Sequence, residues 1–233
     1  MPHYGSREQK EGIVLEGFTW FRQSAFRWTD GRRTLYIDPW GTAEDAAPAD
    51  LILITHAHFD HFQPGEIARL STGDTVVAAP HDVAAELTGN ITPVAPGESH
   101  ELAGVPFTTV PAYNTREEAL AFHPQANRWV GYVIELGDVT AYHAGDTDHL
   151  AELETIRADV ALVPIGGHFT MNPEEAGGLV RAIAPAIAVP MHFGFVVGSP
   201  SDAERFGVAA APVAVKMLTP VDPFEQAEPV ASP

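Results

Sequence analysis

The heptapeptide Thr-His-Ala-His-Phe-Asp-His at residues 55–61 follows directly on the apolar run at residues 51–54. A continuous apolar run of this length, bounded by polar residues, indicates a buried strand that carries the next residues to the end of a sheet. His56 and His58 are two residues apart, so their imidazoles lie on one side of an extended backbone and can hold one ion. The segment therefore favours folds in which a buried strand ends at a metal-binding cleft.

The second half of the heptapeptide offers ligands for a second ion. Asp60 and His61 come where the chain must already turn before Pro64. A single histidine is usually a core or surface residue, but three histidines and a carboxylate this close together are costly to bury without a cation. Because the chain contains no cysteine, any metal must take nitrogen and oxygen ligands.

Two later segments repeat the pattern of an apolar run followed by ligand-type residues. Residues 139–142 lead into His143 and Asp146, and residues 186–189 lead into His192. The Asp146 carboxylate has two oxygens and can bridge two cations. Taken alone, Asp146 could instead cap a helix and His192 could be a buried histidine bonded to backbone. The heptapeptide favours the metal interpretation for both.

The composition limits the remaining possibilities. A chain of 233 residues can form one large α/β domain with a substantial core. Its net charge of −18 predicts no nucleic-acid partner, because such binding depends on lysine and arginine. Prolines and His192 interrupt the longest apolar stretch, residues 182–198, so no membrane span is expected. With a polar N-terminus, we expect a cytoplasmic protein acting on a small-molecule substrate, while a homo-oligomer stays open.

Strand-like runs dominate the first half of the chain and then alternate with helical patterns, which favours sheets flanked by helices. The best helix signal is at Asn172, which is followed by Pro173 and by Glu175 in a capping box and should continue to about Ala184. Shorter helices are expected at residues 81–87 and 199–206. Residues 1–218 should form one domain, and the proline-rich residues 219–233 a loose or surface-hugging tail. The expected strands are residues 13–15, 35–37, 51–54, 75–77, 105–110, 130–136, 139–142, 160–163, 186–189 and 213–218.

The order of the motifs resembles the metallo-β-lactamase superfamily. His-x-His-x-Asp-His at residues 56–61 is followed by Gly-Asp-Thr at 145–147 and Pro-Met-His at 190–192. Ile37-Asp38-Pro39 and the segment at residues 164–171 extend the resemblance to the UlaG-like branch of metal-dependent hydrolases, over roughly residues 12–218. The resemblance implies an α/β fold, a four-layer αββα sandwich with a dinuclear metal centre at one edge.

The resemblance also implies which residues bind the metals. Relatives place a third histidine of the first site where this chain has Asn114, a poor zinc ligand, and His123 is the expected replacement. Gln23 stands where relatives often have a Gly-His pair, so no role is assigned to it. The implied first site is His56, His58 and His123, the second is Asp60, His61 and His192, and Asp146 bridges the two.

The implied activity is metal-dependent hydrolysis of an ester, lactone or phosphodiester by a metal-activated hydroxide. Two divalent ions are expected, zinc first, with manganese or iron as alternatives. Asp60 would orient the nucleophile, and His168, in a Gly-Gly turn, could protonate the leaving group. Asp38 could hold a ligand histidine in one tautomer, and His143 could support a ligand or simply end a strand. A non-catalytic metal- or ligand-binding module on the same fold is the alternative function.

Overall fold

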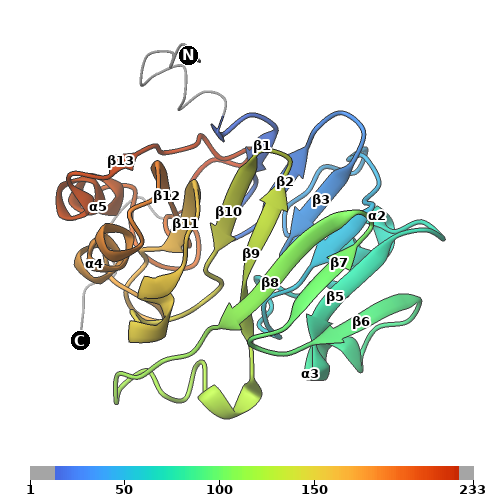
Figure 1. Cartoon of the computed structure of the whole chain (residues 1–233), viewed down its shortest axis with the longest axis horizontal. Helices are drawn as coiled ribbons and strands as arrows, with labels where there is room; N and C mark the ends of the chain where they lie inside the picture. The colour runs from blue at the N-terminus through green and yellow to red at the C-terminus, as the bar shows by residue number, and fades with distance from the viewer. Residues whose placement is uncertain (1–13, 226–233) are drawn as a thin grey trace.

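Two β-sheets face each other at the centre of the molecule, and helices cover their outer faces (Figure 1). The structure is a computed structural model that describes residues 14–225. The first sheet keeps the order of the chain; its first three strands are antiparallel and the rest parallel. Its strands are β1 (Phe18–Trp20), β2 (Phe26–Thr29), β3 (Thr34–Ile37), β4 (Leu51–Leu53), β5 (Val76–Pro80) and β6 (Asn90–Val94).

The second sheet has the order β13-β12-β11-β10-β9-β8-β7. Strands β7 to β10 pair antiparallel, and β10 to β13 pair parallel. The parallel half places the carboxyl ends of β10 and β12 at the same edge, with β11 between them. These strands are β7 (Ser99–Leu102), β8 (Val105–Pro111), β9 (Val130–Leu136), β10 (Val139–His143), β11 (Val160–Pro164), β12 (Ile187–Met191) and β13 (Ala214–Val215).

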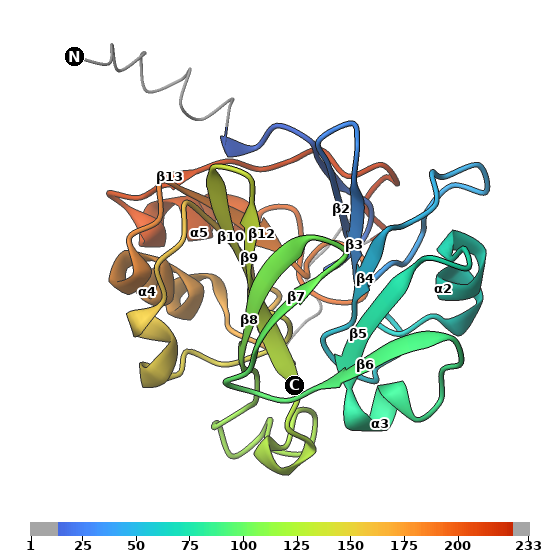
Figure 2. The ribbon, with the colours of Figure 1, turned by 45° about the vertical axis from the view of Figure 1, so that its right-hand side comes forward.

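The helices form the two outer layers. Helices α2 (Pro64–Leu70) and α3 (His81–Ala84) lie beside the first sheet, and α4 (Pro173–Ile183) and α5 (Asp202–Ala210) beside the second, as the turned view in Figure 2 also shows. Two short 3₁₀ helices, η1 (Gln125–Asn127) and η2 (Ala151–Thr155), complete the elements of the described chain. The predicted four-layer αββα sandwich is confirmed.

Strand β4 shows why its sequence is apolar at every position. Leu51 and Leu53 belong to the core between the sheets, whereas Ile52 and the next residue, Ile54, belong to a second core under α2 and α3. A strand covered on both faces buries both sets of alternating side chains, so its sequence loses the usual polar alternation. This double burial fixes the position from which the heptapeptide leaves the sheet.

The best predicted helix forms where its caps indicate. The Asn172 side chain accepts a hydrogen bond from Glu175 N at 2.9 Å, and the Glu175 side chain accepts one from Asn172 N at 2.9 Å. At the other end Ala184 adopts a left-handed conformation with φ of 54°, and Pro185 follows, where a helix cannot continue. The helix therefore begins and ends on local signals alone.

Other elements differ from the prediction. The expected strand at residues 13–15 is wrong for Val14 and Leu15, which precede β1, while Ile13 lies outside the described residues. Helix α2 was not predicted because Pro64-Gly65 suggested only a turn, although proline suits the first position of a helix. Strands β1, β2, β6 and β7 were also missed. In β7 the exposed and half-buried residues of an edge strand give no apolar run.

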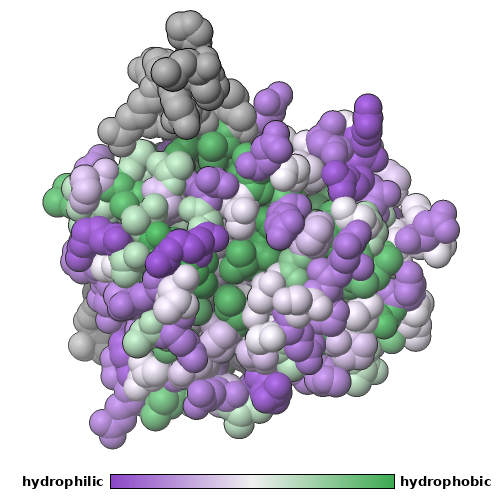
Figure 3. All heavy atoms as spheres, in the orientation of Figure 1, coloured by the Kyte–Doolittle hydropathy of each residue, from purple (hydrophilic) through white to green (hydrophobic). Residues whose placement is uncertain are grey.

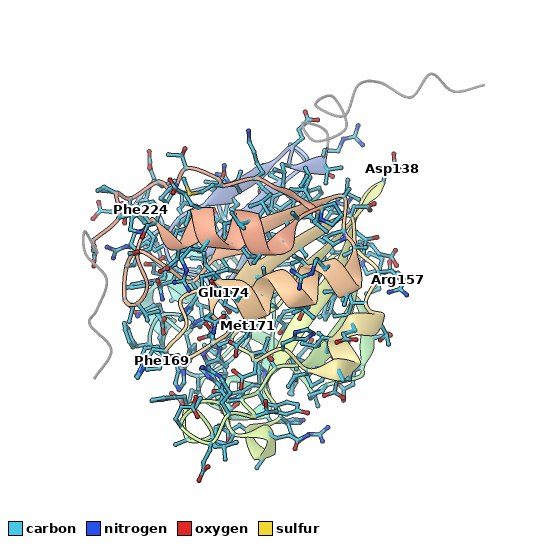
Figure 4. The ribbon with its side chains drawn as sticks, turned by 90° about the vertical axis from the view of Figure 1, so that its left-hand side faces the viewer. Asp138, Arg157, Phe169, Met171, Glu174 and Phe224 are labelled. Atoms are coloured by element: carbon cyan, nitrogen blue, oxygen red, sulfur yellow. The ribbon has the colours of Figure 1, made fainter. Side chains whose placement is uncertain are left out.

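The described part of the C-terminal segment packs on the protein. The Phe224 ring lies 5.8 Å from Trp20, 5.4 Å from Phe193 and 5.3 Å from Phe195, measured between centroids. Figure 4 shows its place on the molecule. Residues 226–233 of the predicted tail lie outside the described residues, and the single domain over residues 1–218 stays a prediction.

No helix within residues 14–225 is both long and apolar enough to cross a bilayer. On the face drawn in Figure 3, hydrophilic and hydrophobic residues are interspersed.

Candidate metal centre

Three strand ends deliver the ligand-type side chains to one place. Beyond β4, His61 N and Phe62 N both donate hydrogen bonds to the carbonyl of His58, at 3.0 and 2.8 Å, so the chain folds back on itself. Beyond β10, Gly145 turns with φ of 62°, and a Cβ there would stand only 3.0 Å from the carbonyl oxygen of Val130. Glycine thus allows the turn carrying Asp146 to pack against its neighbours.

The third strand end presents His192 in a constrained conformation. This residue has a positive φ of 56°, which is uncommon for a residue with a side chain. Its backbone N–H donates to the carbonyl of Gln23 at 3.0 Å. A Cβ on Gly166 would lie 2.3 Å from the carbonyl oxygen of His192, so only glycine lets the two loops approach this closely. Packing between loops therefore sets the direction of the His192 side chain.

All seven predicted ligands come together around Asp146. Its Oδ2 lies 3.0 Å from His192 Nε2 and 3.3 Å from His123 Nε2, and its Oδ1 lies 3.4 Å from His61 Nε2. The other predicted ligands complete two groups whose ligand atoms all lie within 4.8 Å of one another. These groups are His56, His58 and His123, and Asp60, His61 and His192.

The geometry fits divalent ions. Ligand atoms bound tetrahedrally at about 2.0–2.1 Å lie roughly 3.3 Å from one another, which is close to the separations found around Asp146. His61 Nε2, His123 Nε2 and Asp146 Oδ1 are buried and have no hydrogen-bond partner. Buried polar atoms without partners are rare in proteins and need an explanation. A cation between these atoms supplies one.

The charges of the cluster are strongly coupled. Burial by itself lowers the pKa of His192, but the carboxylates of Asp146 and Asp60 outweigh it and raise the pKa to about 9. Burial raises the pKa of Asp60, but the imidazoles of His61 and His192 outweigh it and lower the pKa to about 2. Without a metal the carboxylates thus hold protons on neighbouring imidazoles. We expect metal binding to release such protons.

A buried carboxylate outside the cluster orients two of its histidines. Asp38 Oδ2 accepts hydrogen bonds from His61 Nδ1 at 2.7 Å and from the Thr55 hydroxyl at 2.6 Å. Since that hydroxyl donates to Asp38, His56 Nδ1 donates to Thr55 Oγ1 at 3.0 Å. With Nδ1 of each ring bonded in this way, Nε2 is the nitrogen that faces the cluster and can bind a metal once it has lost its proton. This arrangement supports the predicted role of Asp38.

Asn114 does for His123 what Asp38 does for His61. The Asn114 amide nitrogen donates to Asp148 Oδ1 and to the carbonyl of Phe169, both at 2.9 Å. The amide oxygen therefore faces His123 and accepts from its Nδ1 at 2.7 Å. This leaves Nε2 of His123 to point at Asp146. The asparagine found where the family resemblance implied a histidine thus supports a histidine nine positions later.

Replacing Asn114 by alanine should weaken metal binding by about 10- to 100-fold, the usual effect of losing a hydrogen-bond partner of a ligand histidine. Asn114→Gln keeps an amide that can accept from His123 Nδ1 and donate to Asp148, and it should bind metal more tightly than Asn114→Ala. Zinc titration of the metal-free variants measures both. Asn127→Ala, an exposed asparagine in the same loop, is the control and should match wild type. Equal affinities for Asn114→Ala and Asn127→Ala would remove the role given to Asn114.

The two remaining predicted residues, His143 and His168, have different surroundings. His143 donates from Nε2 to the carbonyl of Ser24 at 2.9 Å and accepts at Nδ1 from Gly145 N at 3.2 Å. It therefore braces the turn before Asp146. His168 is exposed, with its ring 5.5 Å from Phe122 and 4.5 Å from Phe169 between centroids. The structure does not bring His168 into the ligand cluster, and its role as proton donor stays a prediction.

Gln23 contacts residues of the ligand cluster, which the sequence analysis did not predict. It is fully buried, and its side-chain amide donates to Asp60 Oδ2 at 3.3 Å. Its backbone carbonyl accepts from His192 N and from Trp20 Nε1 at 2.8 Å. The departure from the Gly-His pair of relatives was visible in the sequence, but its partners lie 37 and 169 positions away. Gln23 thus touches two residues of the second ligand group.

A cavity of about 190 Å³ opens beside the cluster. Three phenylalanines line it, and each is next to a histidine in the sequence: Phe59, Phe122 and Phe169. Trp129 instead packs its ring on the imidazoles of His56 and His58, at 4.9 and 5.0 Å between centroids. The cavity is lined by His58, Phe59, Asp60, Phe122, His123, Asp146, Phe169, His192 and Val196.

Comparison with known proteins identifies the family. The profile described as Beta-lactamase superfamily domain matches residues 17–192. A UPF0173 metal-dependent hydrolase of Aeropyrum pernix is 33% identical over 89% of this chain and 96% of its own length. One of Thermococcus onnurineus is 39% identical over 76% and 84%, respectively. The solved structure of Igni18, a metallo hydrolase of Ignicoccus hospitalis, has a TM-score of 0.71 and 28% identity over 87% of this chain and 94% of that one. The chain therefore belongs to the beta-lactamase superfamily and, within it, to the UPF0173 metal-dependent hydrolases.

Proposed function

We propose that the protein binds two divalent ions, zinc in the first place, and hydrolyses an ester, lactone or phosphodiester. The observation that carries the proposal is the set of buried atoms without partners, His61 Nε2, His123 Nε2 and Asp146 Oδ1, in the middle of the ligand cluster. Two three-residue ligand groups with no residue in common, one with His56, His58 and His123 and one with Asp60, His61 and His192, support two ions rather than one. A third group, of His56, His61 and Asp146, links them. Nitrogen and oxygen donors alone are compatible with zinc and also with manganese or iron.

Bound divalent ions would lower the pKa of a coordinated water towards neutrality and polarise the scissile group. Asp60 is the chain's own candidate for orienting the attacking water. Its pKa of about 2 keeps it ionised at neutral pH, and the Gln23 amide holds one of its oxygens. Asp60 therefore accepts a hydrogen bond, or transiently a proton, at a fixed position in the cavity.

The UlaG-like branch is the proposed place of the chain within the superfamily. Support comes from the Asp38-Pro39 pair, whose carboxylate holds His61, and from the Gly-Gly turn of residues 166–167, which packs against the His192 loop. The alternative function, a non-catalytic module, was suggested by Asn114, which stands where a histidine ligand of the first site was implied. The contact of His123 with Asp146 supports a replacement ligand and so favours the enzyme.

Removing and restoring metal tests the proposal. We expect about two equivalents of metal per chain by elemental analysis. Dialysis against a chelator should abolish hydrolysis of whichever ester, lactone or phosphodiester in a panel is a substrate, and zinc or manganese should restore it. Metal should also raise the midpoint of thermal unfolding, because a ligand at 100 times its Kd stabilises by about 2.7 kcal/mol. A protein that binds no metal and shows no metal-dependent hydrolysis would favour the non-catalytic module.

A further inference from the structure

Four of the nine residues that line the cavity have apolar side chains, and they are called the apolar wall below. They are Phe59, Phe122, Phe169 and Val196. The rings of Phe122 and Phe169 meet edge to face, with centroids 4.8 Å apart. The other lining residues are ligand candidates of the cluster. The part of a substrate that extends beyond the scissile group therefore contacts carbon.

No lysine or arginine lines this cavity in the described structure. Arg116, which belongs to the adjoining loop, is engaged elsewhere: its guanidinium bonds to Asp148 at 3.1 Å and to the carbonyls of Gly167 and Thr170. The net charge of −18 further disfavours anionic ligands. A carboxylate or phosphate carried on the substrate away from the scissile group would lose water here without gaining a partner.

The cavity has room for a small organic group. Its volume is about 190 Å³. An engineered apolar cavity of roughly 150 Å³ in another protein holds one benzene molecule. The apolar part of this cavity therefore fits a group about as large as a phenyl ring or a short alkyl chain. Phe59, which is 60% exposed, stands at the mouth.

Three observations define the substrate: the apolar wall, the absence of lysine and arginine from the described lining, and the volume of the cavity. From these we propose that the substrate is a neutral carboxylic ester or lactone whose carbonyl carries an apolar group of this size. The inference rests on the proposed hydrolase function and narrows it. In the reaction the oxygen of water bonds to the acyl carbon and the ester C–O bond breaks. The alcohol leaves with one proton of that water, and the second proton is released from the acid. The products are an alcohol and a carboxylate.

A pair of substrates that differ in one charge tests the proposal. p-Nitrophenyl hexanoate and the p-nitrophenyl monoester of adipic acid have acyl chains of equal length, but only the second ends in a carboxylate. We expect kcat/KM of the metal-loaded enzyme to be about 10- to 100-fold higher for the hexanoate. Bis(p-nitrophenyl) phosphate should be a poorer substrate than the hexanoate. Metal-dependent hydrolysis that favours the adipate or the phosphate would overturn the inference and leave the proposed function standing.

Two variants place a cation in the apolar wall. Val196→Arg and Phe59→Arg should each lower the ratio of hexanoate to adipate kcat/KM about tenfold. Phe59 is exposed, so its substitution should leave the fold intact even where that of Val196 does not. Val208→Arg, at a valine of α5 that is 81% exposed, makes the same change away from the cavity and should leave the ratio unchanged. Ratios that stay at the wild-type value in both cavity variants would contradict the proposal.

Binding of fluorobenzene, followed by ¹⁹F NMR, tests the apolar wall without any need for catalytic turnover. The ¹⁹F signal of this neutral probe should broaden and shift with wild-type protein and with Val208→Arg. Val196→Arg should reduce that binding. No binding to wild-type protein would overturn the proposed apolar subsite. Binding without hydrolysis of any ester would retain the subsite and count against the proposed function.

Discussion

Replacing Asp146 with alanine should abolish metal loading and lower kcat/KM by about 1,000-fold or more. Its carboxylate is the group that both halves of the ligand cluster share. A bound metal stabilises the charge of the transition state by several kcal/mol. Each 1.36 kcal/mol of that stabilisation corresponds to a factor of ten in rate. The measurements are metal content per chain by elemental analysis and hydrolysis of the best substrate in the panel.

Two further variants make this test specific. Asp138→Ala removes an exposed aspartate from the turn between β9 and β10. Figure 4 shows Asp138 at the opposite end of the molecule from Phe169, which lines the cavity. It should retain full metal content and activity. Asp146→Asn keeps the shape of the side chain and should lose most of the activity although it folds like wild type. An Asp146→Ala protein that folds, binds two metals and hydrolyses substrate normally would refute the proposed function.

Replacing Asp38 with alanine should lower the free energy of unfolding by about 3–5 kcal/mol, the range for removing one partner of a buried charged pair. Asp38 is fully buried and accepts from Thr55 N at 2.7 Å as well as from the Thr55 hydroxyl and His61. Metal affinity should fall by about 10- to 100-fold because His61 and His56 lose their fixed orientation. Urea denaturation and zinc titration measure the two effects.

The variant Asp38→Asn distinguishes the effect of the side chain's shape from the effect of its negative charge. Asp38 has a positive φ of 46°, a conformation that asparagine tolerates better than alanine does. Asp38→Asn should therefore recover much of the stability but not the full metal affinity, because the amide lacks the negative charge. Asp45→Ala, at an exposed aspartate, should behave like wild type in both measurements. The proposed role fails if Asp38→Ala matches the Asp45→Ala control.

Local sequence patterns were sufficient where one segment settles its own conformation. The capping box of Asn172 begins α4 and Pro185 follows its end, because caps act over a few residues. The apolar run before the heptapeptide predicted β4, and the ordered motifs predicted the fold and the approach of Asp60, His61, Asp146 and His192. Asp146 and His192 meet because β10 and β12 run parallel in one sheet, and Asp60 and His61, which follow β4 of the other sheet, reach them through the packing of the two sheets.

Only the tertiary structure decided which other residues surround the ligands. Asn114 reaches Asp148, 34 positions away, and through it aligns His123. Gln23 reaches Asp60 across 37 positions. The four apolar residues of the cavity, Phe59, Phe122, Phe169 and Val196, come from four different loops. The sequence alone determined β3 to β5, β8 to β13, helix α4 and the types of ligand, because these depend on neighbours along the chain. The orientation of each imidazole and the chemistry of the cavity depend on contacts between distant segments, which exist only once the two sheets have packed.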